Sequence, residues 1–281
     1  MKLSKAILRK LTGEQKKELE LFEMYLFEEE RAKNTIISYI YGVASFFLFG
    51  GELEKVNLVR FKKYLTDKYE PQTVNLRLAG LNNYLIFKGR EDLKIKMLKM
   101  TRSPFTDGVI SEDEYQQLLA VAKIRNKKVY FIIRFLATTG ARISEAVRVT
   151  KQDFMRGYAE MHTKGKHRRI NIPRSFIDES NEFFADLEDK DFLFLNKYEK
   201  QLSTRGIANL LKDIAVKAGV RREVVHPHNF RHFFAIQFLK HNNNLALLAD
   251  LLGHSSVDMT ALYARMSQGQ QREALNDAVV W

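Results

Sequence analysis

The sequence predicts a mainly α-helical chain, with an N-terminal four-helix bundle and a C-terminal α+β domain that contains one small antiparallel β-hairpin. Apolar residues recur at helical spacing along most of the chain, which is typical of amphipathic helices. This periodicity lapses around residues 101–108, where Pro104 and Gly108 indicate a linker. Short alternating runs between residues 158 and 173 indicate the hairpin.

Composition favours a soluble protein with an anionic partner. The 281 residues are 45% hydrophobic, enough for two packed cores, and the formal charge of +12 is shared by both domains. This balance favours double-stranded DNA or another nucleic acid, although an unrelated basic protein would share it. The absence of cysteine excludes thiolate metal sites and fits the reducing cytoplasm. We expect no membrane contact, because the apolar stretch 36–49 is too short to span a bilayer and residues 1–5 do not begin a signal peptide.

Local signals place four helices in the first domain. Thr12 and Gln15 can form a capping box at the start of the first helix. Asn34 is expected to cap the second helix and Asn57 to begin the third. Pro71 separates the third helix from the fourth. Short joints between these helices predict a small bundle.

Two of these helix starts are candidates for DNA contact, because amides, hydroxyls and an arginine at helix N-termini suit phosphates and groove edges. Ordinary capping and a solvated surface would produce the same pattern. The candidate DNA-binding residues are Asn34, Thr35, Tyr39, Thr73, Asn75 and Arg77.

The second domain is expected to begin with another capping box, formed by Ser111 and Glu114. The next helix, from residue 126 to residue 139, is apolar on nearly all sides, so we place it at the centre of this domain. Further helices are expected at residues 183–187 and 203–218.

The buried helix is followed by Gly140, which permits a tight reversal, and then by Arg142 at the start of a short helix. The helix dipole and the free backbone amides favour an anion at that position. Glu145 lies one turn later and is expected to support neighbouring basic groups by hydrogen bonding. Arginine at a helix start is also common on solvated surfaces, so this signal is weak by itself.

The predicted hairpin concentrates basic residues at its tip. A cationic tip can enter a DNA groove, so Lys166 and Arg168 are candidate DNA contacts. Lys164 is the favoured proton donor to a leaving oxygen, with Lys166 as the reserve. Charged tips also occur as guards against the aggregation of edge strands.

The last part of the second domain contains side chains suited to the chemistry of a phosphate ester. A phenol titrates near about 10, so attack by Tyr263 requires neutralisation of the developing charge. Arg231 and Arg142 offer guanidinium forks for phosphate oxygens. His228 can accept the tyrosine proton or bond a phosphate oxygen, and His254 can do the same from the other side.

As a set, these residues resemble the tyrosine recombinase family of phage integrases and Xer-like enzymes. The matching motifs are Thr-Gly-Ala-Arg-Ile-Ser-Glu at 139–145, His-x-x-Arg-His at 228–232 and Leu-Gly-His at 252–254. The resemblance implies six catalytic residues: Arg142, Lys164, His228, Arg231, His254 and Tyr263.

This resemblance also implies an activity and an organisation. The activity is site-specific DNA recombination through a 3′-phosphotyrosyl intermediate and a Holliday junction, with no metal or other cofactor. The partners are double-stranded DNA with an inverted-repeat site and a homotetramer assembled on it. The implied bounds are a core-binding domain at 1–102, a linker at 103–110, a catalytic domain at 111–266 and a tail at 267–281. The tail docks either on a neighbouring subunit or on its own domain.

Three other interpretations use the same residues. A type IB topoisomerase would need the same six side chains, whereas a non-catalytic DNA-binding regulator predicts a damaged site. A metal site could use His226, His228 and His232, but it lacks an obvious carboxylate partner nearby. We therefore leave His226 and His232 out of the predicted chemistry.

Overall fold

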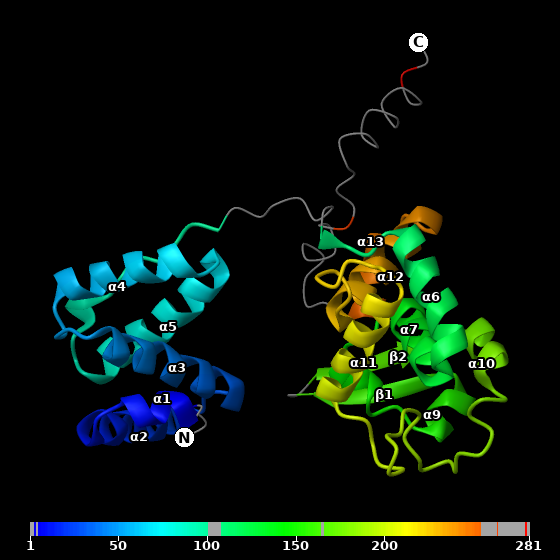
Figure 1. Ribbon diagram of the computed structural model, residues 1–281, viewed down its shortest axis with the longest axis horizontal. Coiled ribbons are helices and arrows are strands. Elements are labelled where there is room, and N and C mark those ends of the chain that lie inside the picture. Colours follow the sequence, from blue (N-terminus) through cyan, green and yellow to red (C-terminus); the bar gives the residue numbers. More distant parts are fainter. Residues whose placement is uncertain are drawn as a thin grey trace. The chain divides into compact units, whose positions relative to one another are not determined.

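The chain forms two compact units, Met1–Arg102 and Ser103–Trp281. The computed structural model describes residues 3, 5–100, 108–163, 166–253, 263 and 279. Both units are mainly helical, and β-structure occurs as a small hairpin in the second unit (Figure 1). Within the described residues, no helix combines the length and the hydrophobicity needed to cross a membrane.

The first unit is a helical bundle around one apolar core. The central contact is between α3 and α5, with α2 and α4 packed against this pair. Fully buried Phe22, Phe46 and Phe61 contribute most of the aromatic volume of the core. Its helices in the described residues are α1 (Lys5–Lys10), α2 (Gly13–Glu28), α3 (Lys33–Phe49), α4 (Lys55–Lys68), α5 (Pro71–Phe87) and the 3-10 helix η1 (Glu91–Leu93). The four expected helices are confirmed, and α1 is an addition that the sequence pattern did not predict.

Helix starts in this unit confirm one capping prediction and correct two. Thr12 and Gln15 form the expected reciprocal capping box at α2. Asn34 was wrongly predicted as a cap, because α3 begins one residue before it and its N-cap residue is Ala32. Asn57 lies inside α4 instead of starting it, and its side-chain amide donates to the Glu52 carbonyl over 3.3 Å.

After η1, an extended segment is hydrogen-bonded to the bundle by two asparagines. Asn75 donates to the Leu98 carbonyl over 3.0 Å and accepts from the Leu98 amide over 2.8 Å. Asn82 makes the same two bonds with Ile95, both at 2.9 Å. The segment therefore belongs to the first unit at least as far as Leu98.

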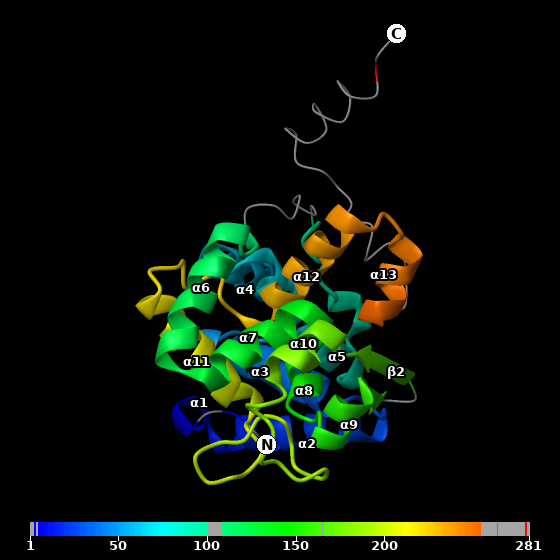
Figure 2. The same ribbon diagram turned by 90° about the vertical axis from the view of Figure 1, so that its right-hand side faces the viewer.

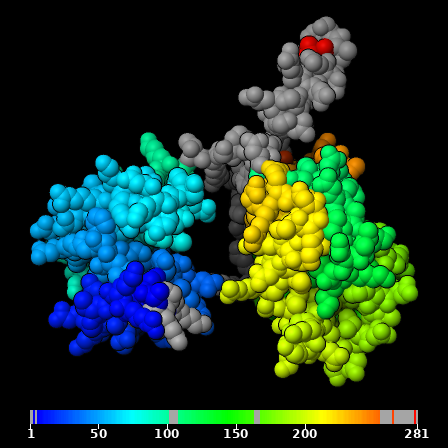
Figure 3. Space-filling view, in the orientation of Figure 1, coloured from blue at the N-terminus to red at the C-terminus, as the bar shows by residue number. Residues whose placement is uncertain are grey.

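The second unit is built around α7, the helix predicted to be central. Eight of its residues are buried, and its neighbours α6 and α12 lie on either side of it in Figure 2. Helices α6 and α11 also contact each other and lie side by side on the face seen in Figure 3. The α-helices in the described residues are α6 (Glu112–Arg125), α7 (Lys127–Thr139), α8 (Ile143–Ala146), α9 (Lys151–Arg156), α10 (Arg174–Ser180), α11 (Thr204–Lys217), α12 (Pro227–His241) and α13 (Leu245–Leu252).

Two expectations about this unit need correction. Residues 183–187, predicted as helix, form turns up to residue 186 and irregular backbone at residue 187. Phe184 is buried there against the aromatic cluster, and its carbonyl accepts from the Lys151 ammonium over 2.9 Å. Ile110, which we placed in the linker, is buried in the core of the second unit. The capping box of Ser111 and Glu114 is confirmed.

The predicted hairpin is confirmed as β1 (Tyr158–Thr163) paired antiparallel with β2 (Lys166–Asn171). Ala159, Met161 and Ile170 point into the core, while Glu160 and His162 alternate with them on the exposed face. Lys164 and Gly165, between the two strands, lie outside the described residues.

Candidate active site

The reversal at Gly140 brings the end of α7 to the start of α8. Gly140 has φ of 59°, in the left-handed region, and a Cβ there would lie 2.5 Å from Cδ1 of Phe234. Only glycine therefore fits this turn. Arg142 follows as the N-cap residue of α8, and its backbone amide donates to Glu145 over 2.7 Å. The Arg142 guanidinium donates to the same carboxylate over 3.0 Å.

Arg231 lies on the first turns of α12 and is one of the most buried side chains in the protein, with 1% of its surface exposed. Its guanidinium donates to the Gly140 carbonyl over 2.8 Å and to the Leu252 carbonyl. These two acceptors lie at the C-terminal ends of α7 and α13, where the helix dipoles favour a cation. Among the described residues no carboxylate forms an ion pair with Arg231, so its acceptors are carbonyl dipoles and not a full negative charge.

Arg168 was predicted as a DNA contact at the hairpin tip, and the structure corrects this. Only 9% of it is exposed, because its position on β2 points inward. The guanidinium pairs with Glu145 over 2.5 Å and donates to the Leu251 carbonyl over 2.9 Å. A Cβ on Gly253, whose φ is 60°, would lie 2.5 Å from Cδ of Arg168. Arg168 therefore joins the hairpin to α8 and to the end of α13.

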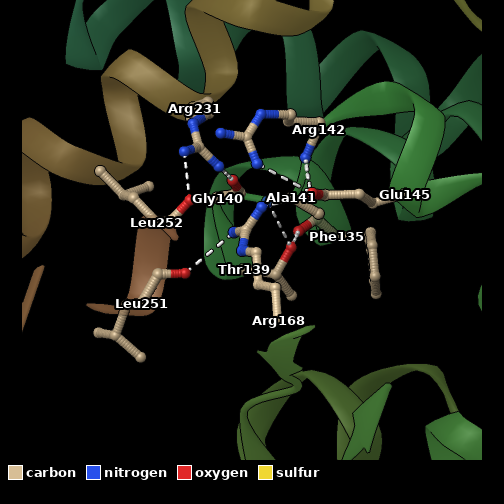
Figure 4. Close-up of polar contacts among 10 residues, drawn as sticks. All are labelled: Phe135, Thr139, Gly140, Ala141, Arg142, Glu145, Arg168, Arg231, Leu251 and Leu252. Carbon is tan, nitrogen blue, oxygen red and sulfur yellow. Dashed lines mark hydrogen bonds and ion pairs between the residues drawn. The ribbon is translucent and has the colours of Figure 1, made fainter. Parts of the chain in front are cut away.

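Three guanidinium groups converge at this point from α12, β2 and the start of α8 (Figure 4). Glu145 is the carboxylate that pairs with two of them, Arg142 and Arg168. Burial alone would raise the pKa of Glu145, but Arg168 and Arg142 hold it below its usual value. Burial, reinforced by Arg168 and Arg142, lowers the pKa of Arg231 to about 9. The cluster therefore carries excess positive charge at neutral pH and is poised for an anion.

Tyr263 contacts His232 of α12, which in turn packs against His228. Its hydroxyl is 2.7 Å from Nδ1 of His232, and the His232 ring packs edge-on against the His228 ring at 4.4 Å between centroids. Burial raises the pKa of Tyr263, although Arg231 and Arg142 oppose the rise. Burial lowers the pKa of His228, and Arg231 adds to the effect, so its imidazole is neutral at neutral pH.

His232, which we left out of the predicted chemistry, therefore lies within hydrogen-bond distance of the Tyr263 hydroxyl. His232 lies one helical turn after His228 on the same face of α12, and this spacing was the available signal. His226, also excluded, is the N-cap residue of α12 and has no side-chain capping bond; burial lowers its pKa.

Comparison with known proteins identifies the family of this chain. Residues 108–270 match the phage integrase family, which is more than half of the chain. The chain belongs to the phage integrase family of tyrosine recombinases. This recombinase is 30% identical to tyrosine recombinase XerA of Thermococcus kodakarensis over 92% of its own length and 94% of the relative.

Solved structures show that the recombinase shares the fold of this family. A lambda integrase dimer bound to a COC' core site matches 90% of the chain with a TM-score of 0.74 and 16% identity. The XerA recombinase crystal structure matches 95% of the chain with a TM-score of 0.55 and 22% identity.

Two of the six predicted catalytic residues of the recombinase, Lys164 and His254, lie outside the described residues. The other four come together in the second unit: Arg142, His228, Arg231 and Tyr263. The charges of Arg231 and Arg142 both lower the pKa of His228 and that of Tyr263. Lys166 is the first residue of β2, paired with Thr163.

The candidate DNA contacts in the first unit of the recombinase differ in their availability. Asn75 has both ends of its amide occupied by Leu98, so we remove it from the predicted contacts. The Arg77 guanidinium lies over the Tyr69 ring at 3.8 Å and near Tyr41 at 5.2 Å. The remaining candidates are exposed Asn34 and half-buried Thr35, Tyr39 and Thr73.

Proposed function

We propose that the chain is a site-specific recombinase that cleaves and rejoins DNA through a 3′-phosphotyrosyl intermediate and a Holliday junction. The observation that carries the proposal is Arg231, a buried guanidinium held by two helix-terminal carbonyls beside Arg142 and Arg168. A buried cation is costly unless an opposite charge approaches it. A phosphodiester would supply this charge, and planar guanidinium forks suit its oxygens.

In the proposed first step, the Tyr263 oxygen attacks phosphorus and displaces the 5′ oxygen of the next nucleotide. The phenol proton passes to an imidazole, and His232 is an acceptor within reach among the described residues, because its Nδ1 lies 2.7 Å from the hydroxyl. Arg231 and Arg142 neutralise the non-bridging oxygens as charge develops. His228, which is neutral at pH 7, bonds one of these oxygens or shares the proton.

The leaving 5′ oxygen requires a proton, which we assign to Lys164 in the hairpin turn, with His254 as a further phosphate contact. Both assignments rest on the family motifs. In the second step a 5′ hydroxyl from another duplex attacks phosphorus and gives its proton to the deprotonated Lys164. The phosphotyrosyl bond breaks, and the imidazole returns the proton to the tyrosine oxygen. One phosphodiester is broken and one is formed, so the reaction requires no cofactor.

The proposed substrate is double-stranded DNA with an inverted-repeat site, bound by a homotetramer in the cytoplasm. The first unit would act as the core-binding domain, with Asn34, Thr35, Tyr39, Thr73 and Arg77 as candidate contacts. The names of the relatives support this proposal, since they include recombinases and an integrase dimer on a core site. The expected tail at 267–281 lies, apart from Val279, outside the described residues, so its docking on a neighbouring subunit stays a prediction.

Trapping of the covalent complex tests this function. The protein is incubated with fragmented genomic DNA of the source organism, denatured, and the attached ends are sequenced. We expect a 3′ adduct at a defined site with the wild type and none with Tyr263→Phe. An adduct that survives denaturation in Tyr263→Phe, or no adduct in the wild type, would contradict the proposal. Adducts without site preference would favour a topoisomerase-like activity.

A further inference from the structure

The exposed face of the hairpin contains a cluster of potential metal ligands. Glu160 and His162 are two residues apart on β1, so their side chains lie on the same face of the strand. His167 on β2 lies directly opposite His162 in the pairing register. All three side chains are exposed, whereas Met161 and its cross-strand partner Arg168 point inward.

The ligand atoms of these side chains already lie close together. One atom from each of Glu160, His162 and His167 lies within 4.8 Å of the other two. Nε2 of His167 is 3.9 Å from the Glu160 carboxylate, and the two imidazole rings are 4.7 Å apart. Small rotations of exposed side chains are therefore enough to direct all three atoms at one ion.

We propose that Glu160, His162 and His167 bind one zinc ion, with water as the fourth ligand. Two imidazoles and one carboxylate are a donor set that zinc uses in tetrahedral sites, and hard cations such as Mg²⁺ prefer all-oxygen sites. Arg169 donates to Oε1 of Glu160 over 3.2 Å and therefore competes with the ion for this carboxylate. That ion pair is exposed on both sides, so its contribution to stability is small.

This site is separate from the proposed chemistry but adjacent to it. The turn that joins the two strands contains Lys164, the assigned proton donor. A metal bridge between β1 and β2 would restrain the strands next to this turn. Zinc is therefore expected to slow DNA cleavage, and this consequence rests on the proposed function, whereas zinc binding does not.

Calorimetry on untagged, metal-free protein titrated with zinc chloride tests the binding. We expect one equivalent to bind in the wild type, and the double variant H162A/H167A to lose this binding. Loss of even an outer-shell partner of a metal ligand weakens affinity by about 10–100-fold, so Glu160→Gln should weaken it at least about tenfold. Arg169→Ala should bind more tightly, because it removes the cation that competes for Glu160.

His241→Ala is the matched control, since His241 is an exposed histidine at the end of α12 and should leave binding unchanged. Melting curves without zinc verify that each variant is folded. Undiminished binding by H162A/H167A would place the ion elsewhere and overturn the proposal. Zinc should slow cleavage by the wild type and not by H162A/H167A; equal inhibition of both would overturn the coupling to the hairpin while leaving the binding result intact.

Discussion

Replacement of Arg168 by Met provides a direct test of the buried ion pair. The change keeps an aliphatic side chain of similar length but removes the bonds to Glu145 and to the Leu251 carbonyl. Breaking a buried pair by removing one partner typically costs about 3–5 kcal/mol. Two effects offset part of this cost. Glu145 keeps its two bonds from Arg142. The substitution also removes the buried Nε of Arg168, which has no hydrogen-bond partner among the described residues. We therefore expect the lower end of the range, about 3 kcal/mol.

Thermal unfolding measures this cost. A loss of about 3 kcal/mol corresponds to a fall in Tm of about 6–12 °C for a domain of this size. Arg169→Met is the matched control, because Arg169 pairs with Glu160 on the exposed face, where ion pairs contribute about 0–1 kcal/mol. The double variant E145Q/R168M should lose at least about 1 kcal/mol less than the sum of the single variants. Additive losses, or equal melting of Arg168→Met and the wild type, would refute the assigned role of Arg168.

Three further predictions follow from the same geometry. Gly253→Ala should destabilise the fold by more than about 1 kcal/mol in urea unfolding, because it adds a clash with Arg168 to a left-handed backbone. Gly219→Ala is the control, because Gly219 has a similar φ of 66° but a Cβ there would meet no atom within 4 Å. It should lose less stability than Gly253→Ala, and equal losses of stability in the two variants would reject the clash. His232→Phe should reduce the single-turnover rate of adduct formation by about 10²–10⁴-fold if its imidazole accepts the tyrosine proton, and an unchanged rate would exclude this role. Folding lowers the pKa values of His226 and His228. As pH falls through about 6.5, the unfolded chain therefore binds more protons than the folded chain. Tm should fall between about pH 7 and pH 5. The fall should be smaller in His228→Gln, and an identical pH profile would contradict the shift.

Local signals in the sequence predicted the fold where the contacts are local. The capping boxes at Thr12 and Ser111 need only residues three positions apart, and the reversal at Gly140 needs only one glycine. Residues 183–187 were mispredicted because the apolar residues there indicate burial, which does not distinguish a helix from a buried turn. Phe184 is buried by contact with Phe154 and Phe194, which are distant in the sequence.

The site was harder to predict where its partners are distant in the chain. Arg168 belongs to a basic run beside a turn, and such residues are usually solvated. Its burial depends on Glu145, 23 positions earlier, and on the end of α13, 83 positions later. His232 contacts Tyr263 across 31 positions, and its spacing from His228 was weighed only as a possible metal site. Arg142 and Arg231 were found because the family motifs contain them.

The two hydrogen bonds of Arg231 affect how inactive relatives can be recognised. The same guanidinium that is proposed to hold the phosphate also caps the C-terminal ends of α7 and α13. In a descendant that had lost recombination, this arginine would still donate to the carbonyls at both helix ends, so its retention would not require the chemistry. The presence of Arg231 in a sequence is therefore a poor marker of catalytic competence. Tyr263, the proposed nucleophile, is the more informative position, because its replacement by phenylalanine preserves the packing of the ring.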